Sequence, residues 1–232
     1  MKTRILILIL CFFTPLTSHA QIELFLKEYA QVQAKFAQEQ IPKITQQYSF
    51  SRDSARAIPF DSGICIITRY DNKVHVEFSG VESFTDGEYL VRVSNPSKFM
   101  VISRSTMNDS AGFSAFIEAG LATFKDANKT TQNDKVIWRL TGGINGVLST
   151  EITLSDTRVL NIIAELSADH PFLAPLFASP TAIRQNVFVT ISYSYSDGLP
   201  EKQVQLSEYI LIDNGTIQPS EKYKEYKLKI IE

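Results

Sequence analysis

Hydrophobic residues recur at helical spacing early in the chain and at alternate positions over most of the rest. Apolar side chains three and four residues apart predict an amphipathic helix that ends before Pro42. Such a helix either covers a hydrophobic core or binds a partner protein. Its apolar members are Ile22, Phe25, Tyr29, Val32 and Phe36.

From about Gln46 the apolar positions alternate, and this pattern predicts short strands joined by tight turns. Strands that are neighbours in the sequence should then be antiparallel neighbours in the sheet. The segments expected as strands are 62–70, 73–79, 88–93, 98–104, 135–140, 147–154, 159–166, 186–195, 203–212 and 222–231.

The turn at Asp71-Asn72 fixes the pairing of the two strands beside it. Tyr70 should pair with Lys73, and counting back places Cys65 opposite Phe78. Because side chains alternate between the faces of a strand, His75 is expected on the polar face of this hairpin.

Two apolar segments break the strand pattern. Residues 111–125 predict a helix, whereas three prolines in 170–184 favour a loop or short helical turns. The polar stretch 126–134 is expected to be a flexible loop. The apolar side chains of the first two segments either complete the core or line or gate a pocket for an acyl chain. The candidate ligand-binding residues are Phe113, Phe116, Ile117, Leu121, Phe124, Phe172, Leu176 and Phe177.

About ten antiparallel strands in one sheet should curl or split, because large twisted sheets rarely stay open and flat. The sequence therefore predicts a mainly β (α+β) fold, a curved antiparallel sheet or half-barrel. An N-terminal helix would pack on it, and the two apolar segments would act as helical plugs on the concave face. No linker is evident, so residues 21–232 are expected to form a single domain.

The first twenty residues have the features of a secretory signal peptide. Lys2 and Arg4 precede an uncharged apolar run, and Ser18-His19-Ala20 is a small-x-small cleavage site. Cleavage after Ala20 would give a periplasmic or secreted protein with no remaining transmembrane segment. It would change the formal net charge from −2 to −4, which offers no electrostatic basis for binding nucleic acid.

The sequence carries no motif typical of a catalytic centre, and we expect a protein that is not an enzyme. Zinc signatures, a glycine-rich phosphate loop and a nucleophile elbow are missing, so neither a metal nor a cofactor is expected. Cys65 would be the single cysteine after cleavage, which excludes a disulfide scaffold. The predicted register places Cys65 and His75 on opposite faces, so Cys65 is expected to be a small buried residue.

Three segments resemble the periplasmic carriers of the outer-membrane lipoprotein pathway, the LolA/LolB-like family. The likeness is clearest at 73–91, where Asp86-Gly87-Glu88-Tyr89-Leu90 is similar to the family's turn and strand. The hairpin 151–163 and the strand 188–193 are similar to later elements. The resemblance implies an N-terminal helix on an incomplete β-barrel whose concave side holds an apolar cavity.

The resemblance implies a non-catalytic periplasmic carrier or binding protein for a lipoprotein acyl chain or similar lipid-like ligand. Segments 111–125 and 170–184 would open over the concave face to admit the ligand. The alternative is a structural or adaptor protein of the envelope that serves a secretion or surface-assembly complex. Such a protein would be recognised by envelope proteins that co-purify with it.

Overall fold

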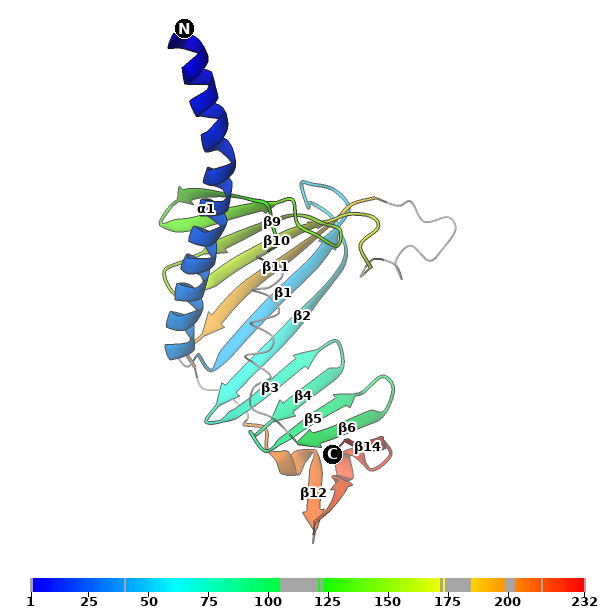
Figure 1. The fold of residues 1–232 in the computed structure, drawn as a ribbon. Helices are drawn as coiled ribbons and strands as arrows, with labels where there is room; N and C mark the ends of the chain where they lie inside the picture. The colour runs from blue at the N-terminus through cyan, green and yellow to red at the C-terminus, as the bar shows by residue number, and fades with distance from the viewer. Residues whose placement is uncertain are drawn as a thin grey trace. The chain divides into compact units, whose positions relative to one another are not determined.

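A computed structural model of the chain describes residues 2–39, 41–104, 121, 123–171, 173, 185–198, 203–213 and 215–231. Over residues 2–19 it describes the backbone alone. The described part is mainly β with one long helix, as Figure 1 shows. Its elements are α1 (Lys2–Gln38), β1 (Lys43–Ser51), β2 (Pro59–Tyr70), β3 (Lys73–Phe78), β4 (Val81–Thr85), β5 (Tyr89–Ser94), β6 (Phe99–Arg104), β7 (Asp126–Gln132), β8 (Lys135–Thr141), β9 (Val147–Leu154), β10 (Val159–Leu166), β11 (Val187–Ser196), β12 (Ile210–Asp213), β13 (Thr216–Pro219), β14 (Lys227–Ile231) and the 3-10 helices η2 (Leu206–Glu208) and η3 (Glu221–Tyr223).

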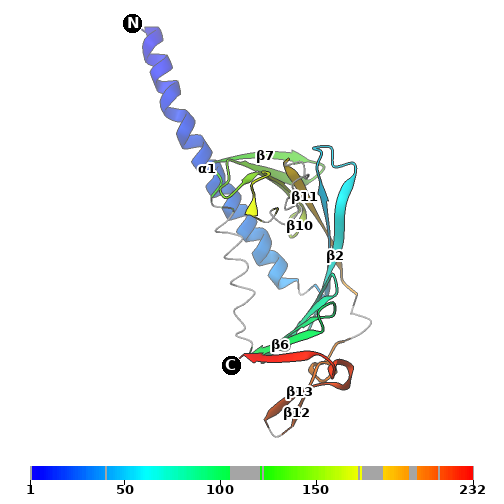
Figure 2. The ribbon, with the colours of Figure 1, turned by 90° about the vertical axis from the view of Figure 1, so that its right-hand side faces the viewer.

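Twelve strands follow one hydrogen-bonded order, β14-β6-β5-β4-β3-β2-β1-β11-β10-β9-β8-β7, and β12 and β13 form a separate two-stranded sheet. The order is linear, so the large sheet does not close on itself. This confirms the predicted class, a mainly β fold of the half-barrel type with an N-terminal helix. The prediction that all the strands are antiparallel is wrong at β14, which pairs in parallel with β6, a strand distant from it in the sequence, as Figure 2 shows.

The chain divides into two compact units. Unit 1 comprises residues 1–39, 48–62 and 114–192, and unit 2 comprises residues 40–47, 63–113 and 193–232. The single domain over 21–232 and the signal peptide over 1–20 stay predictions.

Helix α1 covers part of the core of unit 1 and passes the edge strand β7 (Figures 1 and 2). Phe25 is fully buried, and its ring meets that of Trp138 edge-on at 5.5 Å between centroids. Ile22, Tyr29 and Val32 are buried on the same helix. The core-covering interpretation of the predicted helix is therefore confirmed.

Glu28 connects this helix to two strands. Trp138 Nε1 donates a hydrogen bond to Glu28 Oε2 at 3.1 Å, and Lys129 Nζ lies 2.6 Å from Glu28 Oε1. The Trp138 side chain is fully buried, and among the described residues this carboxylate is the partner of its N–H.

Glu28→Ala is expected to lower the free energy of unfolding of unit 1 by about 1–3 kcal/mol, because it leaves a buried indole N–H unpaired. Trp138 is the single tryptophan of the chain, so its fluorescence during urea unfolding reports on this unit. Glu23→Ala, on an exposed position of the same helix, is the control. Equal effects of the two substitutions would contradict the assigned role of Glu28.

The expected flexible loop at 126–134 is wrong, because most of this stretch is strand β7, paired with β8 over seven residue pairs. Six of its seven residues are exposed and only Ala127 is buried. Its polar composition is typical of a sheet edge rather than of a loop. Asn133 and Asp134 both have positive φ, as a two-residue hairpin turn requires.

The C-terminal segment of unit 2 is less regular than predicted. The 3-10 helices η2 and η3 occupy the first parts of the expected strands 203–212 and 222–231. Strands β12 and β13 form a short hairpin apart from the large sheet. The segment packs on the face of β4, β5 and β6, and its buried core contains Tyr70, Phe84, Val91, Val93, Met100, Ile102, Tyr209, Ile210 and Tyr223.

The register predicted for the β2–β3 hairpin is confirmed. Tyr70 pairs with Lys73 and Cys65 pairs with Phe78. The expected polar face is wrong, however, because His75 is buried, with 4% of its surface exposed. The C-terminal segment covers this face, and Tyr209 lies beside the imidazole with 6.4 Å between ring centroids.

Candidate functional site

An open pocket lies in unit 2 between the end of the sheet and the β12–β13 hairpin. Its first wall is the face of β5, β6 and β14 that also forms the core. In the register, Val91 pairs with Ile102, and Ile102 pairs with Ile230 on the other side. Two residues further along β6, Arg104 pairs with Tyr89 of β5, and both side chains lie on the same face as Ile102. The apolar rows of the core therefore continue into the pocket and end at Arg104.

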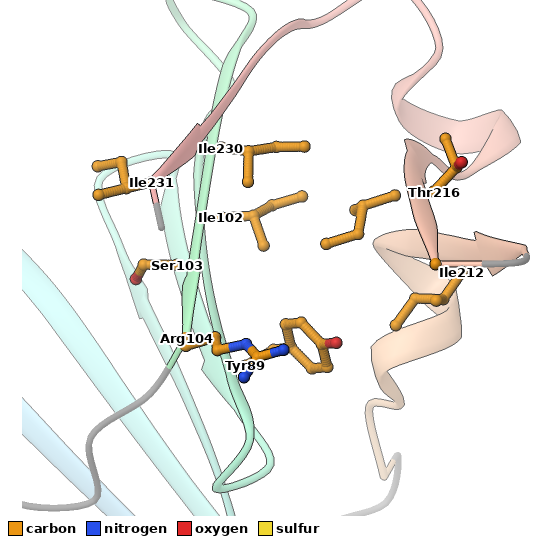
Figure 3. Close-up of a pocket in the computed structure, with 10 residues that line it drawn as sticks. Tyr89, Ile102, Ser103, Arg104, Ile212, Thr216, Ile230 and Ile231 are labelled. Carbon is orange, nitrogen blue, oxygen red and sulfur yellow. The ribbon is translucent and has the colours of Figure 1, made fainter.

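The hairpin supplies the opposite wall. In Figure 3, Tyr89, Ile102 and Ile230 point from the sheet toward the hairpin, on which Ile212 lies. The hairpin turns at Gly215, which has a φ of +79° and no neighbouring atom within 4 Å of an added Cβ. The turn thus leaves open space beside the pocket.

The pocket has a volume of about 800 Å³, within the range of roughly 300–1,000 Å³ usual for small-molecule sites. Most of its lining is apolar, and two of the isoleucines on its facing walls, Ile212 on the hairpin and Ile230 on β14, are about half exposed. Large aliphatic side chains that face an open pocket favour an apolar ligand, since binding removes their surface from water.

Arg104 is the single charged residue among the described residues that line this pocket. Its side chain is exposed, whereas Ile102, two residues earlier on the same face, is buried. No ion pair joins Arg104 to another described residue. Among the described residues, none takes up its guanidinium donors.

A polar cluster around Glu82 lies elsewhere in the same unit. Tyr209 and Tyr223 donate their hydroxyls to Glu82 Oε2 at 3.1 and 3.4 Å, and Asn95 Nδ2 donates to Glu82 Oε1 at 3.0 Å. His75 Nε2 lies 3.8 Å from Glu82 Oε2, too far for a hydrogen bond, and has no hydrogen-bond partner among the described residues. One carboxylate thus joins β4 to the C-terminal segment.

The charge state of this cluster follows from its surroundings. The neighbouring His75 imidazole has the largest effect on the pKa of Glu82. Together with the hydrogen bonds from Asn95 and Tyr209 and the charge of Lys222, it lowers the pKa of Glu82 to about 2 despite partial burial. Burial and the Glu82 charge raise the pKa of Tyr209 and of Tyr223 above the ordinary tyrosine value. At neutral pH the carboxylate is charged and both hydroxyls keep the proton that they donate.

Cys65 and His75 lie on opposite faces of the β2–β3 hairpin, as the register predicted, because His75 pairs with Thr68. They do not form a thiol–imidazole pair. Cys65 is half-buried rather than fully buried, and burial raises the pKa of its thiol, which disfavours a reactive thiolate.

Two of the eight residues predicted to bind a ligand lie in the described part of the chain. Leu121 and Phe124 are buried in unit 1, and a Cβ added to Gly143 would come within 2.9 Å of the Phe124 ring. Their role in ligand binding stays a prediction. Outside the described residues lie Phe113, Phe116, Ile117, Phe172, Leu176 and Phe177, together with most of the predicted plugs.

Sequence reasoning missed the pocket of unit 2 because its walls come from segments far apart in the chain. Ile230 lies beside Ile102 only through the parallel pairing of β14 with β6. A local signal was present in β6, where alternation of apolar residues ends in the charged Arg104. A charged residue at that position is equally typical of the end of a strand, so it does not by itself predict a binding site.

Within the described residues, no group of three or more histidine, cysteine or acidic side chains is arranged to hold a metal ion. The same part of the chain has no helix with the length and apolar character needed to cross a bilayer.

No protein-family model matches the sequence, and no curated protein matches it. Solved structures with some likeness to this fold include the following two. An uncharacterized conserved protein from Thermus thermophilus is 8% identical, with a TM-score of 0.38, over 73% of this chain and 88% of that one. A DUF1329 family protein from Desulfovibrio piger is 11% identical, with a TM-score of 0.25, over 75% of this chain and 94% of that one.

Proposed function

We propose that this protein is a non-catalytic periplasmic binding protein or carrier for an acyl chain, and that the pocket of unit 2 holds that chain. The observation that carries the proposal is the open volume of about 800 Å³ lined by Ile102, Ile212, Ile217 and Ile230. The signal-like N-terminus and the sequence resemblance to lipoprotein carriers support the location and the ligand class.

The energetics of burial are sufficient for such a role. Each methylene removed from water contributes about 0.8 kcal/mol, so a sixteen-carbon chain could gain on the order of 10 kcal/mol before ordering costs. The half-exposed isoleucines would also lose water-exposed surface on binding. An apolar pocket can therefore bind lipid without a dedicated polar motif, and its open side allows the ligand to leave again.

Ile212→Asp is expected to weaken binding of a hexadecyl-chain ligand at least about tenfold, because it places a carboxylate against the chain in an apolar pocket. Binding is measured by displacement of a fluorescent fatty-acid analogue from the purified protein. Leu211→Asp is the matched control, because Leu211 is 53% exposed on the same strand and does not line the pocket.

Native purification followed by mass spectrometry of extracted ligands tests the proposal in the cell's own mixture. An acyl-chain compound should co-purify with the unmodified protein and be depleted from the Ile212→Asp variant. If the protein binds no acyl probe, or if the Leu211→Asp variant loses binding equally, the pocket is not the binding site.

A further inference from the structure

We propose that the acyl ligand carries an anionic carboxylate headgroup, which Arg104 binds. This inference rests on the proposed function, because it assigns the headgroup of the ligand held in the same pocket.

Arg104 lies at the end of the apolar rows. Along this face the side chains pass from Ile102, with 1% of its surface exposed, to the exposed Arg104 two residues later. A chain lying along Ile102 and Ile230 would therefore have one end in the apolar part of the pocket and the other at the guanidinium. Figure 3 shows the side chains of Arg104 and its strand partner Tyr89 directed toward the hairpin.

The charge of the pocket also favours an anionic headgroup. The described lining contains one cation and no carboxylate, and no described residue forms an ion pair with Arg104. Against this apolar lining a neutral headgroup would leave the positive charge without a counter-charge, whereas a carboxylate would neutralise it. A guanidinium can donate two parallel hydrogen bonds to one carboxylate, a geometry that a single hydroxyl cannot match.

The position and charge of Arg104 predict both the chemical class of the ligand and its orientation in the pocket. The ligand is a long-chain fatty acid or another single-chain amphiphile that ends in a carboxylate. Its tail lies toward the buried isoleucines and its headgroup lies at Arg104, where water also has access.

The experiment compares palmitate with hexadecanol, which has the same chain length and a neutral headgroup. The unmodified protein should bind palmitate about tenfold more tightly than hexadecanol, as expected for charge-assisted hydrogen bonds at a partly exposed site. Arg104→Gln should abolish this preference while leaving the affinity for hexadecanol within about threefold of its original value. Arg92→Gln removes an exposed arginine from the opposite face of β5 and should leave the preference intact.

This experiment distinguishes a wrong headgroup assignment from a wrong proposed function. If the protein binds both ligands equally and Arg104→Gln changes nothing, the headgroup assignment is overturned while the acyl site stands. If the protein binds neither ligand, the proposed function itself is wrong. If Arg92→Gln removes the preference as Arg104→Gln does, general surface charge rather than the pocket selects the anion, and the assignment to Arg104 is overturned.

Discussion

Phe84→Ala is expected to lower the free energy of unfolding of unit 2 by about 3–5 kcal/mol, the usual cost of removing a fully buried phenylalanine ring. Phe84 has no exposed surface, and its ring stacks on that of Tyr209 with 5.4 Å between centroids. The substitution would leave a cavity where β4 meets the C-terminal segment. The pocket depends on that contact, because the same segment continues into the β12–β13 hairpin.

The effect is measured by urea unfolding followed by circular dichroism and located by hydrogen exchange over strands β3 to β6. Phe78→Ala is the matched control, because Phe78 lies nearby on β3 and is 41% exposed. Phe78→Ala should lower the free energy of unfolding by about 1 kcal/mol or less. Similar losses for both variants would mean that the C-terminal segment does not pack on Phe84 as described.

Glu82→Gln is expected to cost on the order of 2 kcal/mol at neutral pH, and this cost should shrink as the solution is made acidic. The folded-state pKa of Glu82 is lowered from 4.5 to about 2, so its charged form stabilises the fold. This contribution is complete above the unfolded-state pKa and is lost as the pH falls through 4.5 toward 2. At low pH the protonated carboxyl and the amide of glutamine become nearly equivalent.

The measurement is the difference in unfolding free energy between Glu82→Gln and the unmodified protein in a series of buffers from pH 7 to pH 3. Glu77→Gln is the control, because Glu77 lies 3.5 Å from His75 Nδ1 but its side chain is 56% exposed. Because water screens the exposed Glu77 carboxylate, its pairing with the buried His75 should contribute less than about 1 kcal/mol. A cost for Glu82→Gln that stays constant with pH would contradict the role assigned to its charge.

Sequence patterns correctly predicted the features that depend on residues close together in the chain, such as hairpin register and strand bounds. The Asp71-Asn72 turn fixed the β2–β3 register, because a two-residue turn allows one pairing of the strands beside it. Strands β9 and β10 begin and end at the predicted residues, since each alternates regularly and the turn between them is polar.

The errors arose where distant segments decide the environment. His75 was assigned to the polar face because nothing local reveals that Tyr209 will cover it. Strand β7 was mistaken for a loop because an edge strand with one buried residue has no apolar alternation. The pocket depends on Ile230 reaching Ile102 from a distant part of the chain, and no periodicity encodes that pairing.

Strands β7 and β14 are the two edges of the large sheet, and their lysines affect whether copies of the protein can associate edge to edge. An edge strand offers unsatisfied amides that can template the growth of fibrils. Lys227 and Lys229 lie on the β14 edge, whereas Lys129 on the β7 edge is paired with Glu28. A strand that adds to β14 would have to dehydrate the two ammonium groups, and a second copy docking there edge to edge would bring like charges together. The lysines of β14 thereby disfavour edge-to-edge association.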